Sequence, residues 1–297
     1  MCRFLTYTGA PLMLADLLYR PANSLIMQSY HAREREEPLN GDGFGVGWYV
    51  PEVDPTPCVQ RSVSPAWSNH NLQSLSVKTR ASCLFAHVRA ASPGMLVTEV
   101  NVHPFSYDRF MWMHNGVISG FHHIKRRLRE SLKDEFYDMI QGTTDSEHAF
   151  ALFLNSLRAS FGEVSGEEMR RALVETIARL NEWTSAAGVS DPSFCNFAVT
   201  DGRTTVVSRY SSGEGIKGAS LHYSRGVRFE CLPDGLCDMH PVAQDEPAYS
   251  VIVASERLTD DPTDWIDVPD NHTITVSPDS NVQLEEIKIG NEVMSHE

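Results

Sequence analysis

Short runs of β-forming residues, bounded by turn residues, recur along this chain and constrain its fold more than any other feature. They predict strands over residues 2–8, 44–50, 83–89, 110–114, 195–200, 204–210, 220–224 and 249–254. Helices are expected at 146–161 and 166–186, and apolar residues recur at three- and four-residue intervals in the second. Because these helices interrupt two groups of mainly adjacent strands, the pattern predicts sheets packed together with helices outside.

Local signals refine this α+β prediction. Asp201-Gly202 predicts a hairpin turn between two strands. Ser165 with Glu168, and Thr144 with Glu147, have the spacing of helix capping boxes. No linker rich in Pro, Gly or Ser divides the chain, so we expect one domain over residues 2–270 and a peripheral extension over 271–297.

Composition excludes several functional classes. The formal net charge of −14 disfavours nucleic acid and anionic membranes as partners, because both require a basic surface. The basic run at residues 125–129 is interpreted as a solvated helix face. The six cysteines contain no CxxC pair, and His122-His123 would point apart on a helix, so we expect no metal or other cofactor. The absence of a secretory signal and of a long apolar run leads us to expect a cytoplasmic protein.

The second residue is a cysteine, followed by Arg3-Phe4. Removal of Met1 would place a thiol and an α-amine on one residue, which joins a nucleophile to its own base. The alternative is that Cys2 is a small apolar residue at the start of a strand. Lipidation of Cys2 finds no support in its flanking residues.

Two further segments end or begin strands with unusual residues. The first, residues 40–48, contains four glycines; it predicts either an active-site wall, with Asn40, Gly41 and Asp42 at its start, or a hairpin turn. In the second, Arg89 ends an apolar strand and offers a planar fork suited to a carboxylate, although a surface ion pair explains it equally. His87 lies on the same strand face, where a buried core histidine is the simpler interpretation.

Two polar motifs could contribute donors or charge. Asn115 and Gly116 could direct a side-chain amide and a backbone N–H at one oxygen, as an oxyanion hole requires. The alternative is an Asn-Gly turn, which the dipeptide alone favours. Asp145 would lie in the first turn of a helix, where a carboxylate suits the helix dipole and could also bind a substrate ammonium group.

Taken in order, these motifs resemble the class II glutamine amidotransferases of the N-terminal-nucleophile hydrolase superfamily. The resemblance is carried by Met1-Cys2-Arg3-Phe4, Asn40-Gly41-Asp42-Gly43, His87-Val88-Arg89, His103-Pro104-Phe105, His114-Asn115-Gly116 and Thr144-Asp145-Ser146-Glu147. It implies a four-layer αββα sandwich with Cys2 as nucleophile. It also implies an oxyanion hole at Asn115 and Gly116, with Arg89 on the substrate α-carboxylate and Asp145 on its α-ammonium. His87, Asn40, Gly41 and Asp42 are further expected substrate-binding residues.

Four more segments resemble the amidotransferase-like subunits of fungal glutathione-degrading complexes and, more loosely, the γ-glutamyl amidohydrolase of ergothioneine biosynthesis. These are Arg20-Pro21-Ala22-Asn23-Ser24, Ser64-Pro65-Ala66-Trp67-Ser68-Asn69, residues 196–202 and Val253-Ala254-Ser255-Glu256.

This resemblance implies hydrolysis of a γ-glutamyl amide, in glutathione or a related thiol peptide, through a thioester on Cys2. It also implies a peptidase-like partner chain. Two alternatives stay open: a glutaminase that supplies ammonia to a partner synthase, and a catalytically silent scaffold subunit of a peptidase complex.

Overall fold

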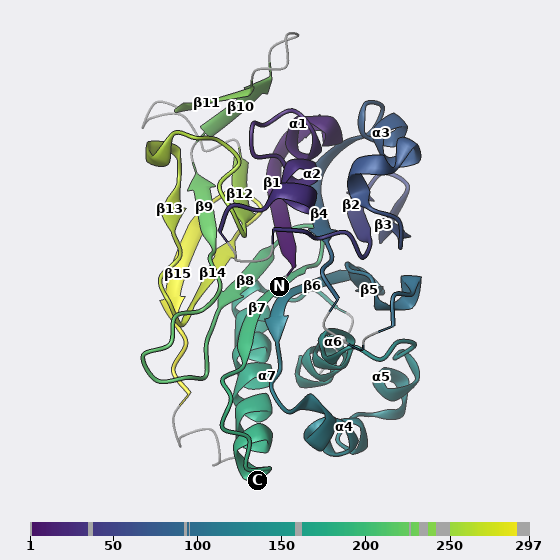
Figure 1. Ribbon diagram of the computed structural model, residues 1–297, viewed down its shortest axis with the longest axis vertical. Coiled ribbons are helices and arrows are strands. Elements are labelled where there is room, and N and C mark those ends of the chain that lie inside the picture. The colour runs from purple at the N-terminus through teal and green to yellow at the C-terminus, as the bar shows by residue number, and fades with distance from the viewer. Residues whose placement is uncertain are drawn as a thin grey trace.

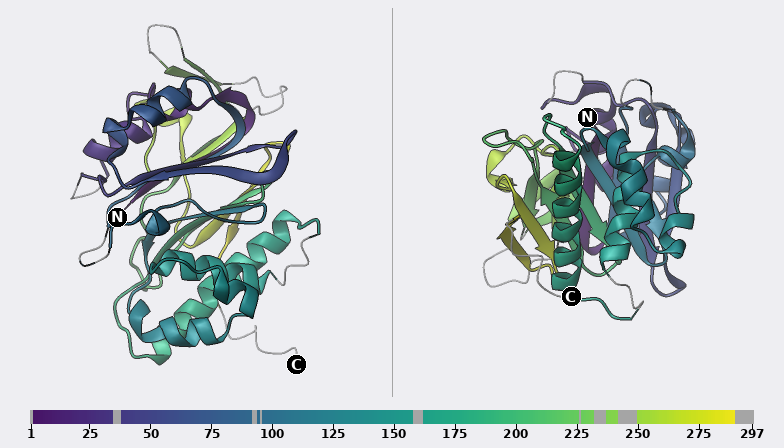
Figure 2. Two further views of the ribbon diagram at one scale, coloured as in Figure 1. Left: turned by 90° about the vertical axis from the view of Figure 1, so that its right-hand side faces the viewer. Right: turned by 90° about the horizontal axis from the view of Figure 1, so that it is seen from below.

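A computed structural model describes residues 2–34, 38–91, 94, 96–157, 162–225, 227–231, 237–241 and 250–289. Within these residues, two antiparallel sheets pack face to face, and each outer face is covered by helices (Figures 1 and 2). This is the four-layer αββα sandwich that the resemblance implies. None of the described helices is both long and apolar enough to cross a bilayer.

The first sheet has strand order β13-β9-β12-β1-β4-β2-β3, which places β1 in its middle. Its strands are β1 (Arg3–Met13), β2 (Phe44–Val50), β3 (Asp54–Ser62), β4 (Arg80–Val88), β9 (His222–Arg225), β12 (Ser250–Ala254) and β13 (Ile266–Asp267). Its outer face is covered by α1 (Leu14–Leu18), α2 (Leu25–His31) and α3 (His70–Ser76), with the short 3-10 helix η1 (Ala66–Ser68) nearby. A separate hairpin comprises β10 (Val227–Cys231) and β11 (Cys237–Pro241).

The second sheet has strand order β15-β14-β8-β7-β6-β5. Its strands are β5 (Phe105–Tyr107), β6 (Phe110–Val117), β7 (Phe194–Thr200), β8 (Thr205–Arg209), β14 (His272–Val276) and β15 (Val282–Glu286). Its outer face is covered by α4 (Phe121–Glu130), α5 (Asp134–Asp138), α6 (Asp145–Ser156) and α7 (Gly166–Ala186). The 3-10 helices η2 (Glu99–Asn101) and η3 (Pro262–Asp264) lie in connections. The domain boundary at residue 270 stays a prediction; β14 and β15 follow it in sequence and pair within this sheet.

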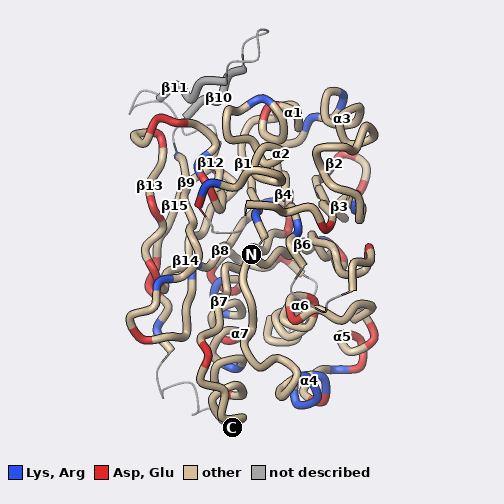
Figure 3. Tube along the Cα trace, viewed as in Figure 1, with Lys and Arg blue, Asp and Glu red and all other residues tan. Residues whose placement is uncertain are grey.

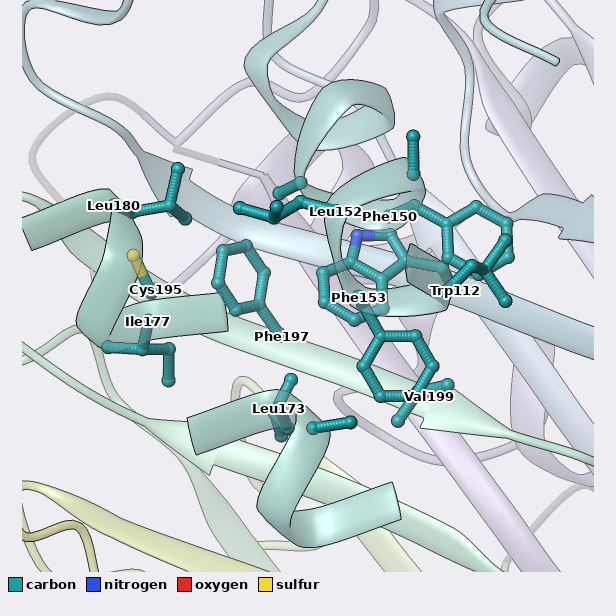
Figure 4. Close-up of a cluster of buried hydrophobic side chains, with 14 of the residues drawn as sticks. Trp112, Phe150, Leu152, Phe153, Leu173, Ile177, Leu180, Cys195, Phe197 and Val199 are labelled. Carbon is teal, nitrogen blue, oxygen red and sulfur yellow. The ribbon is translucent and has the colours of Figure 1, made fainter. Parts of the chain in front are cut away.

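The outer face of the second sheet buries aromatic side chains against α6 and α7. Trp112 stacks on Phe150 with ring centroids 5.6 Å apart and lies 4.7 Å from Phe197 (Figure 4). The predicted apolar stripe of α7 packs here, since Leu173 and Ile177 are fully buried in the same cluster. A fully buried side chain of this size contributes about 1.5–3 kcal/mol through the hydrophobic effect. The cluster therefore holds α6 and α7 against the second sheet.

The glycines of β2 allow the two layers to approach each other. A Cβ atom on Gly45 would lie 2.0 Å from the His103 carbonyl oxygen, and one on Gly47 would lie 2.3 Å from Met111 Sδ. Any larger residue would therefore push β2 away from the chain that leads into the second sheet. This close approach, rather than a hairpin turn, explains the glycine density that the sequence shows.

Most predicted elements agree with the structure, and two local predictions need correction. The Asp201-Gly202 hairpin joins β7 and β8 as expected, and Ser165 with Glu168 forms a capping box. Thr144 caps α6, but the Glu147 carboxylate does not complete that box, because it accepts hydrogen bonds from the backbone of residues 141 and 142 instead. The Asn-Gly turn is wrong: residues 115 and 116 lie inside β6 and pair with β7.

Charged residues follow the predicted distribution. The basic residues of α4 form the densest blue segment in Figure 3. Arg126 pairs with Glu130 at 2.8 Å, and Arg127 pairs with Glu182 at 2.9 Å, all with largely exposed side chains. The run is a solvated helix face with surface ion pairs, which contribute little to stability.

Candidate active site

Cys2 directly precedes β1. It therefore lies at the end of the first sheet where β4 ends. The register pairs Arg3 with Val88, so the residue before β1 faces the residues after β4. The Cys2 sulfur lies 3.4 Å from the backbone nitrogen of Ala90 and 3.5 Å from its carbonyl oxygen. The side chain is half-buried. The fold therefore holds this thiol beside the end of β4, next to Arg89.

Arg89, next to that contact, is a buried cation. It is 4% exposed, and its Nη2 lies 3.4 Å from the Leu96 carbonyl oxygen. Among the described residues, its Nη1 has no hydrogen-bond partner, and no carboxylate forms an ion pair with its guanidinium group. A buried charge normally requires a partner, so this guanidinium is suited to receive an anion from outside the protein.

The segment from Asn40 to Asp42 contacts the backbone that directly follows β4. Asp42 Oδ2 accepts a hydrogen bond of 2.8 Å from the Ala91 backbone, and the Asp42 N–H donates to the Arg89 carbonyl. Asn40 is fully buried and donates from Nδ2 to the Gln28 carbonyl at 3.0 Å. The ring of Trp67 covers Gly41, where a Cβ atom would lie 2.9 Å from it. Direct substrate contact by residues 40–42 stays a prediction.

Asn115 and Gly116 lie near the end of β6 in the second sheet. Asn115 is fully buried, and its Nδ2 donates to Ser255 Oγ at 3.2 Å. The same oxygen accepts the Phe4 backbone N–H at 3.1 Å, which connects Asn115 to the strand that begins after Cys2. A Cβ atom on Gly116 would lie 1.9 Å from the Phe194 carbonyl oxygen, so only glycine fits there.

Asp145 is the first residue of α6, and backbone groups hold its carboxylate. Oδ2 accepts from the Ile118 N–H at 2.9 Å, and Oδ1 accepts from the Ser146 N–H at 2.8 Å. Its side chain is partly exposed. A carboxylate at a helix N-terminus is stabilised by the helix dipole and keeps lone pairs for a cationic group.

Asn101 connects the surroundings of Arg89 and Asp145. Its Nδ2 donates to the Leu96 carbonyl at 3.1 Å, the oxygen that Arg89 also approaches. Its Oδ1 accepts from the Thr143 N–H at 2.9 Å, two residues before Asp145. The structure therefore joins the cationic and the anionic side of the predicted site through one buried amide.

Two buried histidine rings, those of His87 and His103, lie behind these residues. His87 is fully buried, lies 4.2 Å from His103 by ring centroids, and contacts the His114 carbonyl oxygen through Nε2 at 3.3 Å. Burial lowers the pKa of His87 to about 3 and holds the pKa of His103 well below the usual value. These rings are neutral near pH 7. Substrate binding by His87 stays a prediction.

Sequence reasoning did not assign roles to Ser255, Asn101 or the ion pair of Arg3 and Glu256. Arg3 Nε lies 2.6 Å from Glu256 Oε1, both side chains are almost fully buried, and Arg3 Nη1 donates to the Cys2 carbonyl. A charged residue inside an apolar strand was the available signal for Arg3. Ser255 and Asn101 have no such signal, because single polar residues in short loops are common.

Two surface hollows lie away from these residues. One of about 750 Å³ includes Tyr49, Arg109 and Arg203 in its lining, and one of about 480 Å³ is lined by residues of α4 and by Tyr137 of α5. No predicted site residue lines either hollow. Within the described parts of the chain, no group of His, Cys, Asp and Glu side chains has the arrangement of a metal site.

Comparisons with known proteins identify the family of the chain. A family model described as "Glutamine amidotransferases class-II" matches residues 13–289. The chain is 42% identical to "Probable glutamine amidotransferase DUG3" of Saccharomyces cerevisiae, over 93% of this chain and 82% of that protein. It is 31% identical to "Gamma-glutamyl-hercynylcysteine sulfoxide hydrolase" of Mycolicibacterium smegmatis, over 93% of this chain and 96% of that one.

Solved structures share the fold. A glutamine aminotransferase class-II domain protein from Silicibacter pomeroyi superposes with a TM-score of 0.64 at 24% identity, covering 96% of this chain and 99% of that chain. Glutamine phosphoribosylpyrophosphate amidotransferase from B. subtilis superposes with a TM-score of 0.60 at 14% identity, covering 97% of this chain and 50% of that chain. With the family match over most of its length, the chain belongs to the class II glutamine amidotransferases and is an enzyme of that family.

Proposed function

We propose that this enzyme hydrolyses the amide bond of a γ-glutamyl compound with Cys2 as nucleophile. The observation that carries the proposal is the buried Arg89 guanidinium, whose Nη1 has no partner among the described residues and whose chain neighbour Ala90 contacts the Cys2 sulfur. A glutamyl group presents an α-carboxylate and an α-ammonium at one end and an amide carbonyl at the other. Arg89 and Asp145 suit the first two groups, and Cys2 suits the third.

The reaction divides into two steps. The Cys2 thiolate attacks the γ-carbonyl carbon, and the negative charge on its oxygen is stabilised by the Asn115 amide and the Gly116 N–H. The α-amine of Cys2, which becomes available once Met1 is removed, accepts the proton of the thiol in this attack. The C–N bond then breaks, and the leaving amine takes that proton from the resulting α-ammonium. Water attacks the resulting γ-glutamyl thioester, which releases glutamate and restores the thiol.

We further propose glutathione or a related γ-glutamyl thiol peptide as substrate, with a peptidase-like partner chain. The γ-glutamyl compound in the name of the Mycolicibacterium smegmatis relative supports a substrate larger than glutamine. The second candidate is a glutaminase that supplies ammonia to a partner synthase, which the glutamine amidotransferase name of the yeast relative favours. Arg89 and Asp145 do not distinguish the two candidates, because both substrates present the same glutamyl group.

The test is an assay of glutamate release from glutamine, glutathione and γ-glutamyl dipeptides, with and without candidate partner chains. Intact mass first establishes that Met1 is absent. Release from glutathione but not from glutamine supports the first candidate, and the reverse supports the second. If none of these compounds yields glutamate through Cys2 under any of these conditions, the proposed hydrolysis is wrong and a scaffold role takes its place.

A further inference from the structure

We infer that Ser255 is a positioning residue that orients the oxyanion-hole amide of Asn115 relative to the nucleophile. This inference rests on the proposed function of Cys2 and Asn115. Ser255 touches neither the substrate nor the sulfur in the proposed reaction; it acts through the Asn115 side chain.

The backbone of Ser255 is fixed on both sides. It directly follows β12, which pairs with β1 in the first sheet, and it is fully buried. Its N–H donates to the Phe4 carbonyl at 3.0 Å, and its own carbonyl accepts from Ser220 Oγ at 2.8 Å. These two bonds leave its hydroxyl at a defined position between the two sheets.

The Ser255 hydroxyl oxygen has two lone pairs, and both meet N–H donors. One donor is the Phe4 backbone at 3.1 Å, and the other is Asn115 Nδ2 at 3.2 Å. Phe4 lies two residues after Cys2 in the first sheet, whereas Asn115 lies on β6 in the second. One oxygen atom therefore links the strand that carries the nucleophile to the strand that carries the oxyanion donor.

This link determines which proton of Asn115 is available for catalysis. A side-chain amide has two N–H groups, and Ser255 engages one of them. The other is left for the oxygen that becomes negative in the transition state. Asn115 Oδ1 has no hydrogen-bond partner among the described residues, so the hydrogen bond from Nδ2 to Ser255 sets the orientation of the amide. Without it, the amide would rotate more freely and stabilise the oxyanion less well.

The test compares Ser255→Ala with Ser255→Thr, which keeps the hydroxyl. We expect S255A to lower kcat about tenfold while KM changes by less than about twofold, because loss of one hydrogen bond affects the transition state through Asn115. S255T should recover most of that loss. The rate at which iodoacetamide alkylates Cys2 should change by less than about twofold in S255A, since alkylation does not use an oxyanion hole. A matching fall in alkylation would instead indicate general damage and overturn the inference.

A double-mutant cycle with Asn115→Ala separates positioning from a merely structural role. If Ser255 acts through Asn115, S255A should lower kcat by less than about twofold in the N115A background. An equal fall in both backgrounds overturns the inference. If N115A is as active as the unmodified enzyme, the proposed oxyanion hole fails; if N115A is impaired and S255A is not, only the role of Ser255 fails.

Folding is checked by circular dichroism and thermal unfolding. Should S255A not fold, Ser255→Cys replaces it in the same cycle, because a thiol fills similar space but is a weak acceptor. The same fall in kcat, confined to the background with intact Asn115, is expected. A Ser255→Cys enzyme with normal kcat would contradict the inference.

Discussion

Arg3 and Glu256 form an ion pair of 2.6 Å that solvent scarcely reaches, one residue away from the proposed nucleophile. Arg3 also donates to the carbonyls of Cys2 and Glu34, and Glu256 accepts the backbone N–H groups of Arg33 and Glu34. The pair therefore holds the backbone on either side of the site with charged hydrogen bonds.

Replacing Glu256 by Gln should leave the Arg3 charge uncompensated in the interior. Removing one partner of a buried pair costs about 3–5 kcal/mol, so E256Q should lower the free energy of unfolding by about 3 kcal/mol in urea titrations. Glu130→Gln breaks the exposed pair with Arg126 and should cost less than about 1 kcal/mol. Equal losses in the two variants would show that the buried pair has no special role.

Cys2→Ala should abolish release of glutamate, because no other nucleophile is proposed. Cys58→Ala is the matched control, since Cys58 is exposed on β3, and it should keep full activity. Burial raises the pKa of Cys83 to about 12 and also raises that of Cys195, so neither buried thiol can substitute as a thiolate. Glutamate release by C2A at the normal rate would exclude the proposed mechanism.

Asn115→Ala should reduce kcat by about two to three orders of magnitude with little change in KM, as expected for an oxyanion-hole donor. The measurement is steady-state kinetics with the substrate that the assay identifies. Asn155→Ala removes an amide from α6 that bonds the Lys133 backbone, and its kcat should match that of the unmodified enzyme. A similar loss in both variants would point to impaired folding instead.

Arg89→Lys should raise KM by about tenfold or more, because an ammonium cannot reproduce two parallel hydrogen bonds to a carboxylate. Arg126→Lys, on the exposed face of α4, is the matched control and should leave KM unchanged. A comparison with a substrate that lacks the α-carboxylate sharpens the result. If R89K loses activity equally on both substrates, Arg89 does not bind that group.

Stability should decline in acid because His87 and His103 are buried as neutral rings. Burial lowers the pKa of His87 to about 3, so below about pH 6.5 the unfolded chain binds a proton that the folded chain does not. Stability therefore falls as the pH decreases from about 6.5 towards 3, by about 1.4 kcal/mol per pH unit for each such histidine. His87→Gln should flatten this slope in urea titrations at several pH values. His123→Gln, which changes an exposed ring, should leave it unaltered.

The sequence predicted eight strands that bury apolar residues and missed others for different reasons. The eight predicted strands are all present, because each has a run of β-forming residues that faces a core. β3 contains two prolines and lies at the edge of the first sheet with partly exposed residues, so neither its composition nor its periodicity marks it. β14 has alternating β-forming residues and buries Ile274 and Val276, but it was missed because residues 271–297 were interpreted as a peripheral extension.

The site was predicted residue by residue from motifs, but not its internal connections. Cys2, Arg89, Asn115 and Asp145 follow from the resemblance, and their catalytic and binding roles stay predictions. The bond from Asn115 to Ser255 joins residues 140 positions apart on different sheets. No local pattern encodes such a contact, because it depends on how the two layers pack.

The central position of β1 has a consequence for biosynthesis. Its contact between Phe4 and Ser255 spans 251 residues, and β12 must pair beside it before that contact exists. During translation the sulfur thus leaves the ribosome long before the segment that completes its surroundings. Nascent and prematurely terminated polypeptides would therefore carry the thiol without the residues that surround it in the folded protein. Hydrolytic activity would appear only after both sheets have formed and packed together.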